Sequence, residues 1–234
     1  MNQTFPMRAV AHIRSDFPSK FGVPRQSGLV ESLEAAVVFE PPFRDPEALR
    51  GLEGFSHLWL VWVFHQAAGR PWSPTVRPPR LGGNRRLGVF ATRSPFRPNP
   101  IGLSSVALEE IRRTPDLGPV LLVRGADLVD GTPILDIKPY LPYADCRPDA
   151  SDGFAPPPEP PLAVEFPPEL LERVPADRRE ALMGVLAQDP RPRYQSSPDR
   201  VYGFGFAGLE VRFTVREGRL RVEEVLPGEG AQRI

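Results

Sequence analysis

Prolines separate the apolar segments of this chain and limit the ways in which those segments can be connected. The sequence has 31 prolines, and most of them fall between the segments that show a regular apolar pattern. Proline fixes φ and lacks a backbone N–H, so it suits connections better than the interiors of helices or strands. The prolines therefore indicate rigid connections rather than disorder.

Most segments between these prolines show the patterns of β-strands. Residues 7–13 alternate between apolar and polar positions, which predicts a half-buried strand. Residues 57–64 form a continuous apolar run, which predicts a fully buried central strand that delivers His65 and Gln66 at its end. Asp45 and Pro46 suit the cap and first position of one short helix. Further strands are predicted at 35–39, 87–92, 103–111, 120–129 and 133–137.

About seven strands with one short helix and no alternation of strands and helices point to a mostly-β sandwich or barrel in the N-terminal part. Residues 144–161 are polar, acidic and proline-rich, as expected of an extended linker. Beyond them, 167–188 has helical spacing with a break near Pro175, and three strands are predicted at 201–206, 211–215 and 219–225. We therefore expect a mostly-β and α+β protein with a β-barrel at 1–145, a linker at 146–162 and a small α+β domain at 163–234.

A block of arginines stands out from the neutral charge of the whole chain. Residues 70–108 hold seven arginines and no Asp or Glu, together with stiffening prolines, Phe96 and Asn99. Guanidinium groups on a rigid loop suit a phosphorylated or nucleobase-bearing ligand. The alternative is an ordinary solvated loop. Only two of the 29 basic residues are lysines, so arginine is common throughout this chain and does not by itself indicate a ligand site.

Several classes of protein do not fit the sequence. A lone cysteine, Cys146, excludes an internal disulfide, offers no metal-binding pattern and agrees with a reducing cytoplasm. The N-terminus lacks the pattern of a signal peptide, and the longest apolar run is too short to span a membrane. No glycine-rich dinucleotide fingerprint, Walker loop or zinc spacing is present. We therefore expect no metal and, if a nucleotide-like cofactor binds, a scaffold that is not a Rossmann fold.

A second unusual stretch, 127–140, carries three carboxylates, a lysine and a tyrosine around a predicted turn. Asp136, Lys138 and Tyr140 follow one another at the strand period, so they should share one face. There the carboxylate can accept a proton and the lysine can hold an anion. The alternative is an ordinary surface ion pair of little energetic worth. Of the histidines near the central strand, His57 fits a structural role, whereas for His65 a ligand contact and a structural role are both open.

Five blocks of sequence follow one another along the chain: FGVPRQSGLV, GLEGFSHLWLVWVFHQ, RPPRLGGNRRLGVFATRSPFRPNPIGLS, DLVDGTPILDIKPYLPYAD and VLAQDPRPRY. In these blocks, over residues 5–225, the chain resembles the TrmO (YaeB/TsaA-like) family of S-adenosylmethionine-dependent tRNA N6-methyltransferases. The resemblance implies a barrel that binds S-adenosylmethionine without a Rossmann fold. It also implies a cytoplasmic homodimer with the cofactor near the subunit interface. The implied substrate is the threonylcarbamoyl-modified adenosine (t6A) just 3′ of the anticodon in threonine tRNA, which gains a methyl group on N6 and becomes m6t6A.

The resemblance also implies site residues. Cofactor contacts are expected at Pro24, Arg25, Gln26, His65, Gln66, Arg93, Leu103, Asp130, Gly131, Thr132 and Pro133. We further expect Asp136, or a water that it orients, to be the general base. Lys138 would stabilise developing charge, and Tyr140 would lie beside them. Contacts with tRNA are expected at Arg85, Arg86, Phe96, Arg97 and Asn99, with Phe96 stacking on an unpaired base.

Two other readings compete with the enzyme. A barrel that binds RNA loops without chemistry would bind RNA in a salt-sensitive way and gain no stability from S-adenosylmethionine. A sensor of a phosphorylated metabolite would bind that metabolite and ignore RNA. A methyltransferase would be stabilised by S-adenosylmethionine.

Overall fold

This computed structural model describes residues 3–78, 85–155, 160–191, 197 and 200–228 of the chain. Arg80 of the arginine block, part of the predicted linker and the last residues of the block VLAQDPRPRY lie outside this range. The described residues are mainly β-strands with a few short helices, which confirms the prediction of a mostly-β and α+β protein.

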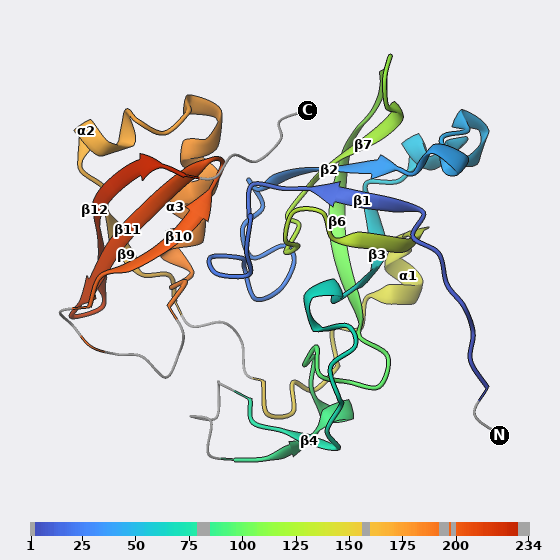
Figure 1. The fold of residues 1–234 in the computed structure, drawn as a ribbon, viewed down its shortest axis with the longest axis horizontal. Coiled ribbons are helices and arrows are strands. Elements are labelled where there is room, and N and C mark those ends of the chain that lie inside the picture. The colour runs from blue at the N-terminus through green and yellow to red at the C-terminus, as the bar shows by residue number, and fades with distance from the viewer. Residues whose placement is uncertain (1–2, 79–84, 156–159, 192–196, 198–199, 229–234) are drawn as a thin grey trace.

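Six strands of the N-terminal part close on themselves into a barrel in the order β1-β2-β7-β6-β3-β8. Every neighbouring pair is antiparallel (Figure 1). The interior is filled by apolar side chains from all six strands, including Ile13, Val37 and Leu60. The strands are β1 (Ala11–Arg14), β2 (Glu34–Phe39), β3 (His57–Val63), β6 (Ile101–Thr114), β7 (Gly118–Arg124) and β8 (Pro133–Pro139).

Short helical turns connect these strands. Asp45 caps the predicted helix as expected, since its Oδ1 accepts a hydrogen bond of 2.9 Å from the N–H of Glu47, but the turn that follows is a 3-10 helix. The short helices of this part are η1 (Pro41–Phe43), η2 (Pro46–Leu49), η3 (Leu52–Gly54), η4 (His65–Ala67), η6 (Val89–Ala91) and α1 (Pro142–Asp145).

The prediction that β3 is fully buried is wrong. Leu58, Leu60 and Trp62 point into the barrel and are buried, whereas Trp59 and Val61 on the other face are only half-buried. A barrel has one interior, so alternate residues of every strand must face outward. The apolar run of β3 therefore places an apolar stripe on the outside of the barrel.

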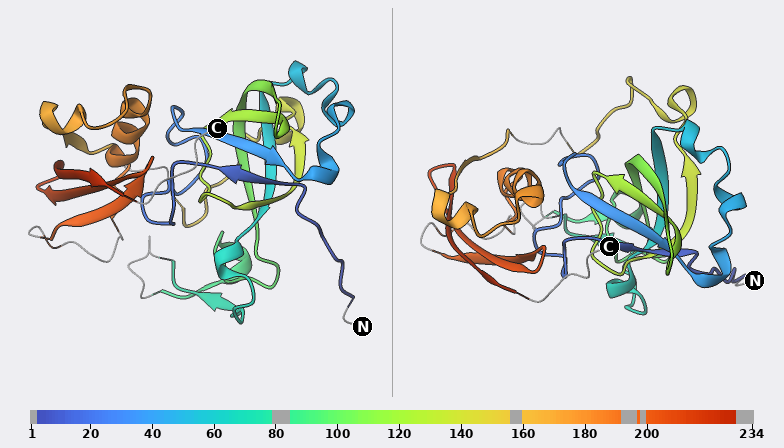
Figure 2. Two further views of the ribbon diagram at one scale, coloured as in Figure 1. Left: turned by 45° about the horizontal axis from the view of Figure 1, so that its top comes forward. Right: turned by 90° about the horizontal axis from the view of Figure 1, so that it is seen from above.

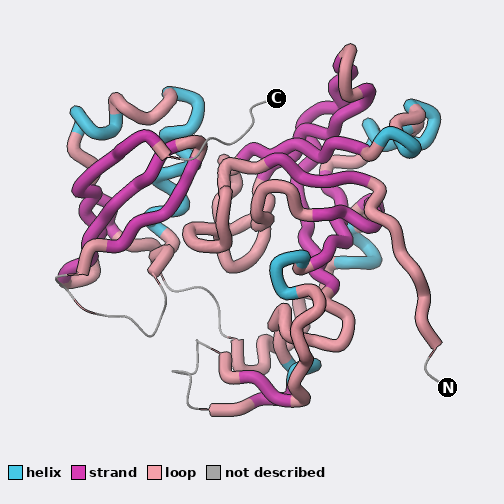
Figure 3. The backbone as a smooth tube through the Cα atoms, in the orientation of Figure 1, coloured by secondary structure: helices cyan, strands magenta, loops and turns pink. Residues whose placement is uncertain are grey.

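The predicted strand at 87–92 is also largely wrong. Only Leu87–Gly88 is a strand, β5, which pairs with β4 (Thr75–Val76) to form a small arm below the barrel (Figure 3). The 3-10 helix η6 follows at once, because Val89 is buried and the Thr92 hydroxyl donates back to the Val89 carbonyl at 2.8 Å. These contacts turn the chain where the apolar pattern alone suggested extension.

The C-terminal part is a four-stranded sheet in the order β10-β11-β12-β9. The helical segment with a break near Pro175 is confirmed, and so are the three predicted strands. Strand β9, which pairs in parallel with β12, was not predicted. The elements are β9 (Ala163–Glu165), α2 (Pro168–Leu171), η7 (Ala176–Arg178), α3 (Arg179–Ala187), β10 (Tyr202–Phe206), β11 (Leu209–Arg216) and β12 (Arg219–Pro227).

The loop between β1 and β2 lies between the two sheets (Figures 1 and 2). Its residues Phe17, Val30 and Leu33 belong to the apolar core of the C-terminal sheet and not to the barrel interior. Burying one such side chain contributes about 1.5–3 kcal/mol. The N–H of Ala207 also donates to the Asp16 carbonyl at 2.9 Å. The loop that carries Pro24, Arg25 and Gln26 is therefore anchored at both of its ends in the C-terminal core.

Candidate functional site

Strand β6 offers a stretch of backbone that β7 does not cover. β6 pairs with β3 over 101–107, but its pairing with β7 begins only at Ala107. In an antiparallel ladder, peptide groups alternate between the two neighbours. The N–H of Leu108 donates to Ser56, on the side of β3. Leu103 and Ser105 lie an odd number of residues before Leu108, so their peptide groups point to the opposite side, which β7 leaves open. The backbone of Leu103 can therefore bind a ligand there.

The loop that carries Pro24–Gln26 lies along this open edge. The N–H of Ser105 donates to the Ser27 hydroxyl at 3.2 Å, and the N–H of Gly28 donates to the Gly125 carbonyl at 2.9 Å. Gln26 in turn accepts a hydrogen bond from the Arg93 guanidinium. Gln26, Arg93 and Leu103, three of the predicted cofactor residues, therefore come from distant parts of the sequence to one place.

The predicted Asp130–Pro133 turn is fixed by the end of β1. Asp130 Oδ1 accepts from the N–H of Ser15 at 2.9 Å, the N–H of Gly131 donates to Ile13, and the Thr132 side chain is buried. Gly131 has a φ of 73°, which favours glycine at this position. The turn is thus rigid, and it follows the segment 125–129 that borders the open edge of β6.

Three other predicted residues, or their immediate neighbours, make contacts outside this group. Arg25 Nη2 donates to the Asp189 carbonyl at 3.5 Å and so reaches the C-terminal part. His65 and Gln66 lie in η4, where the neighbouring Phe64 N–H donates to Pro100, just before β6. Within the described ranges, no hydrogen bond or ion pair joins His65 or Gln66 to the other predicted cofactor residues.

Asp127 was missed as a site residue. It follows β7, and its Oδ1 accepts a hydrogen bond of 2.6 Å from the Ser104 hydroxyl. That hydroxyl accepts a hydrogen bond of 2.9 Å from the Trp62 indole N–H. Burial raises the pKa of Asp127, and the hydrogen bond from Ser104, nearby backbone groups and Arg93 partly oppose this. The only signal in the sequence was its membership of the carboxylate-rich stretch 127–140.

Asp136 and Lys138 share one face of β8, on the outside of the barrel, and Tyr140 follows directly after the strand. Lys138 Nζ lies 2.8 Å from Asp136 Oδ2, which confirms the expected ion pair and raises the pKa of Lys138. The centroid of the Tyr140 ring lies 5.5 Å from the centroid of the Trp59 ring. Asp136 pairs with Val61 of β3, and Val61 pairs with Leu103 of β6. Two strand spacings therefore separate Asp136 from Leu103, about 10 Å.

The described residues of the arginine block form the arm and the loop that leads into β6. Arg85 and Arg86 are exposed, and Arg86 Nε donates to the Thr75 hydroxyl at 2.8 Å. Arg97 donates to the Thr92 carbonyl at 3.1 Å and so also supports its own loop. Asn99 is exposed, and its carbonyl accepts from the N–H of Ile101. The exposed aromatic side chains of this region are Trp72, Phe90 and Phe96, of which only Phe96 was predicted to bind RNA.

Two further findings concern the described residues only. None of their His, Cys, Asp and Glu side chains form a group of three or more that could hold a metal ion. None of their helices is long and apolar enough to cross a membrane.

Two family models match the chain, the N-terminal domain of tRNA-methyltransferase O over residues 12–146 and the TrmO C-terminal domain over 159–228. A tRNA (adenine(37)-N6)-methyltransferase of Escherichia coli is 45% identical over 96% of this chain and 99% of its own length. A Pseudomonas aeruginosa protein with the name "Putative S-adenosylmethionine-dependent methyltransferase RcsF" is 44% identical over 97% of this chain and 100% of its own.

Solved structures agree with these similarities. A crystal structure of TrmO from Pseudomonas aeruginosa superposes with a TM-score of 0.78 at 40% identity. It covers 97% of this chain and 99% of that chain. The similarity therefore includes the barrel, the loop after β1 and the C-terminal sheet.

Proposed function

Because the chain belongs to the tRNA-methyltransferase O family, we propose that it is a tRNA (adenine(37)-N6)-methyltransferase that uses S-adenosylmethionine. The specific substrate that we propose is t6A of threonine tRNA, which is converted to m6t6A in the cytoplasm. The observation that carries the proposal is the meeting of Gln26, Arg93 and the open edge of β6 beside an arm rich in arginine and aromatic residues.

The residues at this edge fit the chemical groups of S-adenosylmethionine. The Arg93 guanidinium suits the cofactor carboxylate, and the free peptide groups of Leu103 suit the hydrogen-bonding edge of adenine. His65, Gln66 and the turn at 130–133 would complete the pocket, with Pro24 and Arg25 shaping its wall. Bound there, the cofactor supplies a sulfonium methyl group for in-line transfer.

On the substrate side, Asp136 is our candidate for the general base. The carbonyl attached to N6 of t6A withdraws electrons, so a carboxylate or a water that it orients suffices to remove the proton. Lys138, held 2.8 Å from Asp136, would stabilise negative charge on the substrate, with Tyr140 beside it. Arg85, Arg86, Arg97 and Asn99 would meet the anticodon loop, and Phe96 would stack on a base.

We also propose that the protein is a homodimer whose catalytic domain spans 1–145, with a linker at 146–162 and a C-terminal domain at 163–234. The apolar stripe on the outer face of the barrel supports a dimer, because Ile101 and Leu103 are exposed there beside half-buried Val61. Light scattering should give twice the mass of one chain, and a monomer at micromolar concentration would refute this part of the proposal.

The experiment that tests the function is transfer of a labelled methyl group from S-adenosylmethionine to threonine tRNA. We expect transfer to tRNA that carries t6A and none to the unmodified transcript. Asp136→Asn and Arg93→Ala should abolish it, whereas Asp116→Asn, in the exposed β6–β7 turn, should not. Tight, salt-sensitive binding of tRNA without any transfer would instead favour a non-catalytic RNA-binding barrel.

A further inference from the structure

Asp127 lies where the segments of the cofactor pocket meet. An indole N–H only donates and an ionised carboxylate only accepts, so the direction of the chain Trp62–Ser104–Asp127 is fixed. The Ser104 side chain is 1% exposed and points into the barrel. The peptide groups of its neighbour Leu103 lie in the plane of the sheet and point to the open edge of β6. Asp127 thus fixes the part of β6 that would hold the cofactor.

Asp127 also faces the other two segments. The N–H of Gly28 donates to the Gly125 carbonyl at 2.9 Å, which holds the loop after β1 beside the segment of Asp127. The backbone of Ser27 and the charge of Arg93 both lower the pKa of the Asp127 carboxyl. Arg93 donates in turn to Gln26, next to Ser27, and the Ser27 hydroxyl accepts from Ser105 of β6. One carboxylate therefore interacts with the loop after β1, the loop of Arg93 and strand β6.

We propose that Asp127 is a positioning residue, whose ionised carboxylate holds Arg93 and the loop at 24–27 in the geometry that receives S-adenosylmethionine. This inference rests on the function proposed above. It adds to that function a residue that none of the expected cofactor contacts includes.

The charge of Asp127 is what separates this role from a structural one. A neutral Asn could accept the Ser104 hydrogen bond without the desolvation that a buried carboxylate suffers. Only a negative charge attracts the guanidinium of Arg93 and orders it before the ligand arrives. A carboxylate that is buried at a cost to folding and feels the charge of a specific cationic residue is typical of functional sites.

The test is calorimetric titration of S-adenosylmethionine into the wild type, Asp127→Asn and the control Asp116→Asn. We expect the Asp127→Asn protein to bind about 10-fold more weakly or worse, as for loss of a hydrogen bond to a charged group, with no such loss in the control. In turnover with t6A-containing tRNA, its KM for S-adenosylmethionine should rise more than its kcat falls. Thermal unfolding would establish that each variant is folded.

The pH dependence of wild-type binding gives a second readout that needs no variant. Arg93 is the charged group that acts on Asp127, and it does not titrate in the working range, while Ser27, Ser104 and Trp62 are neutral. The wild-type affinity should therefore fall as the pH drops through a range somewhat above that of an ordinary aspartate. The Asp127→Asn protein should lack this change.

The possible outcomes are distinct. If the wild type does not bind S-adenosylmethionine, the proposed function fails. If the wild type binds and folded Asp127→Asn binds within twofold of it at every pH, the positioning role is refuted while the function stands. A flat wild-type pH profile would also refute it, even if the variant cannot be folded.

Discussion

At Gly102 the indole of Trp62 lies directly against the backbone of β6. A Cβ atom at this position would lie 2.3 Å from Trp62 Cε2, closer than side chains approach one another in proteins. Because the Trp62 N–H holds Ser104, and Ser104 holds Asp127, the close approach at Gly102 supports the whole hydrogen-bond chain.

Gly102→Ala should therefore push the indole away and disturb both stability and cofactor binding. Overpacking of this kind costs about 1–3 kcal/mol, which urea unfolding would measure. Gly54→Ala is the matched control, since a Cβ there meets nothing within 4 Å. Equal stability of the two variants would show that Trp62 can move without penalty.

The charge of Asp127 predicts a stability effect of defined sign. Burial raises the pKa of Asp127 in the folded state. The stability that this group contributes is therefore fully present below the ordinary aspartate pKa. It is lost as the pH rises through the raised pKa. Asp127→Asn does not titrate. The stability of Asp127→Asn relative to wild type should therefore increase from pH 4 to neutrality, as followed by thermal unfolding. A difference that is constant with pH would contradict this.

At the scale of elements, the sequence predicted what depends on local pattern. The alternating residues of β10 to β12, the cap at Asp45 and the shared face of Asp136 and Lys138 all follow from two-residue or capping patterns. The expected meeting of Gln26, Arg93 and Leu103 came from family resemblance, since no local pattern joins residues so far apart.

The features that the sequence did not predict share a physical cause, because all of them depend on tertiary contacts. The end of β7 at Arg124, well before the predicted end at 129, leaves the edge of β6 open, and the hydrogen bond from Ser105 to Ser27 forms across that gap. The parallel strand β9 and the role of Asp127 also depend on partners distant in sequence. None of these features is marked in the sequence by a regular spacing or a motif.

The loop after β1 is held in the C-terminal core by close contacts, and Gly22 tests this. Gly22 has a φ of 91°, and a Cβ there would lie 2.3 Å from the Phe204 ring. Gly22→Ala should lose about 1–2 kcal/mol from backbone strain alone and more from the clash. Gly69→Ala, with a φ of 78° and open space, isolates the strain. Equal losses in urea unfolding would mean that the loop is not tightly docked.

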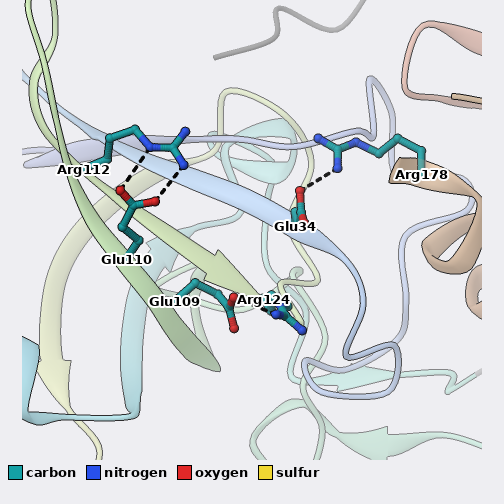
Figure 4. A network of polar contacts seen from close by, with 6 residues as sticks. All are labelled: Glu34, Glu109, Glu110, Arg112, Arg124 and Arg178. Carbon is teal, nitrogen blue, oxygen red and sulfur yellow. Dashed lines mark hydrogen bonds and ion pairs between the residues drawn. The ribbon is translucent and has the colours of Figure 1, made fainter. Parts of the chain in front are cut away.

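At the scale of the whole molecule, Arg178 connects the C-terminal part with the barrel. Its Nη1 lies 2.6 Å from Glu34 of β2, and its Nε lies 3.2 Å from Asp16 of the loop (Figure 4 shows the pair with Glu34). The side chains of Arg178 and Asp16 are only 18% and 13% exposed, so this ion pair is screened less than those on the surface.

Arg178→Ala should therefore destabilise the protein by about 1–3 kcal/mol, because it removes a charged hydrogen-bonding partner of a partly buried carboxylate. The matched control is Arg212→Ala, which breaks the exposed pair with Glu224 and should cost at most about 1 kcal/mol. Urea unfolding would measure both, and a larger loss in the control would contradict the argument from burial.

The distribution of charge over the whole molecule predicts how it should bind tRNA. The chain is formally neutral, yet Arg85 and Arg86 lie in a stretch without acidic residues, beside exposed aromatic rings. Phosphate contacts release counterions, so removing one should weaken binding and lower the slope of log affinity against log salt by about one. Arg85→Ala and Arg86→Ala should each do so in filter-binding titrations with t6A-containing threonine tRNA. Arg219→Ala, on the C-terminal sheet, should leave the slope unchanged. An unchanged slope in both arm variants would show that these arginines of the arm do not contact tRNA phosphates.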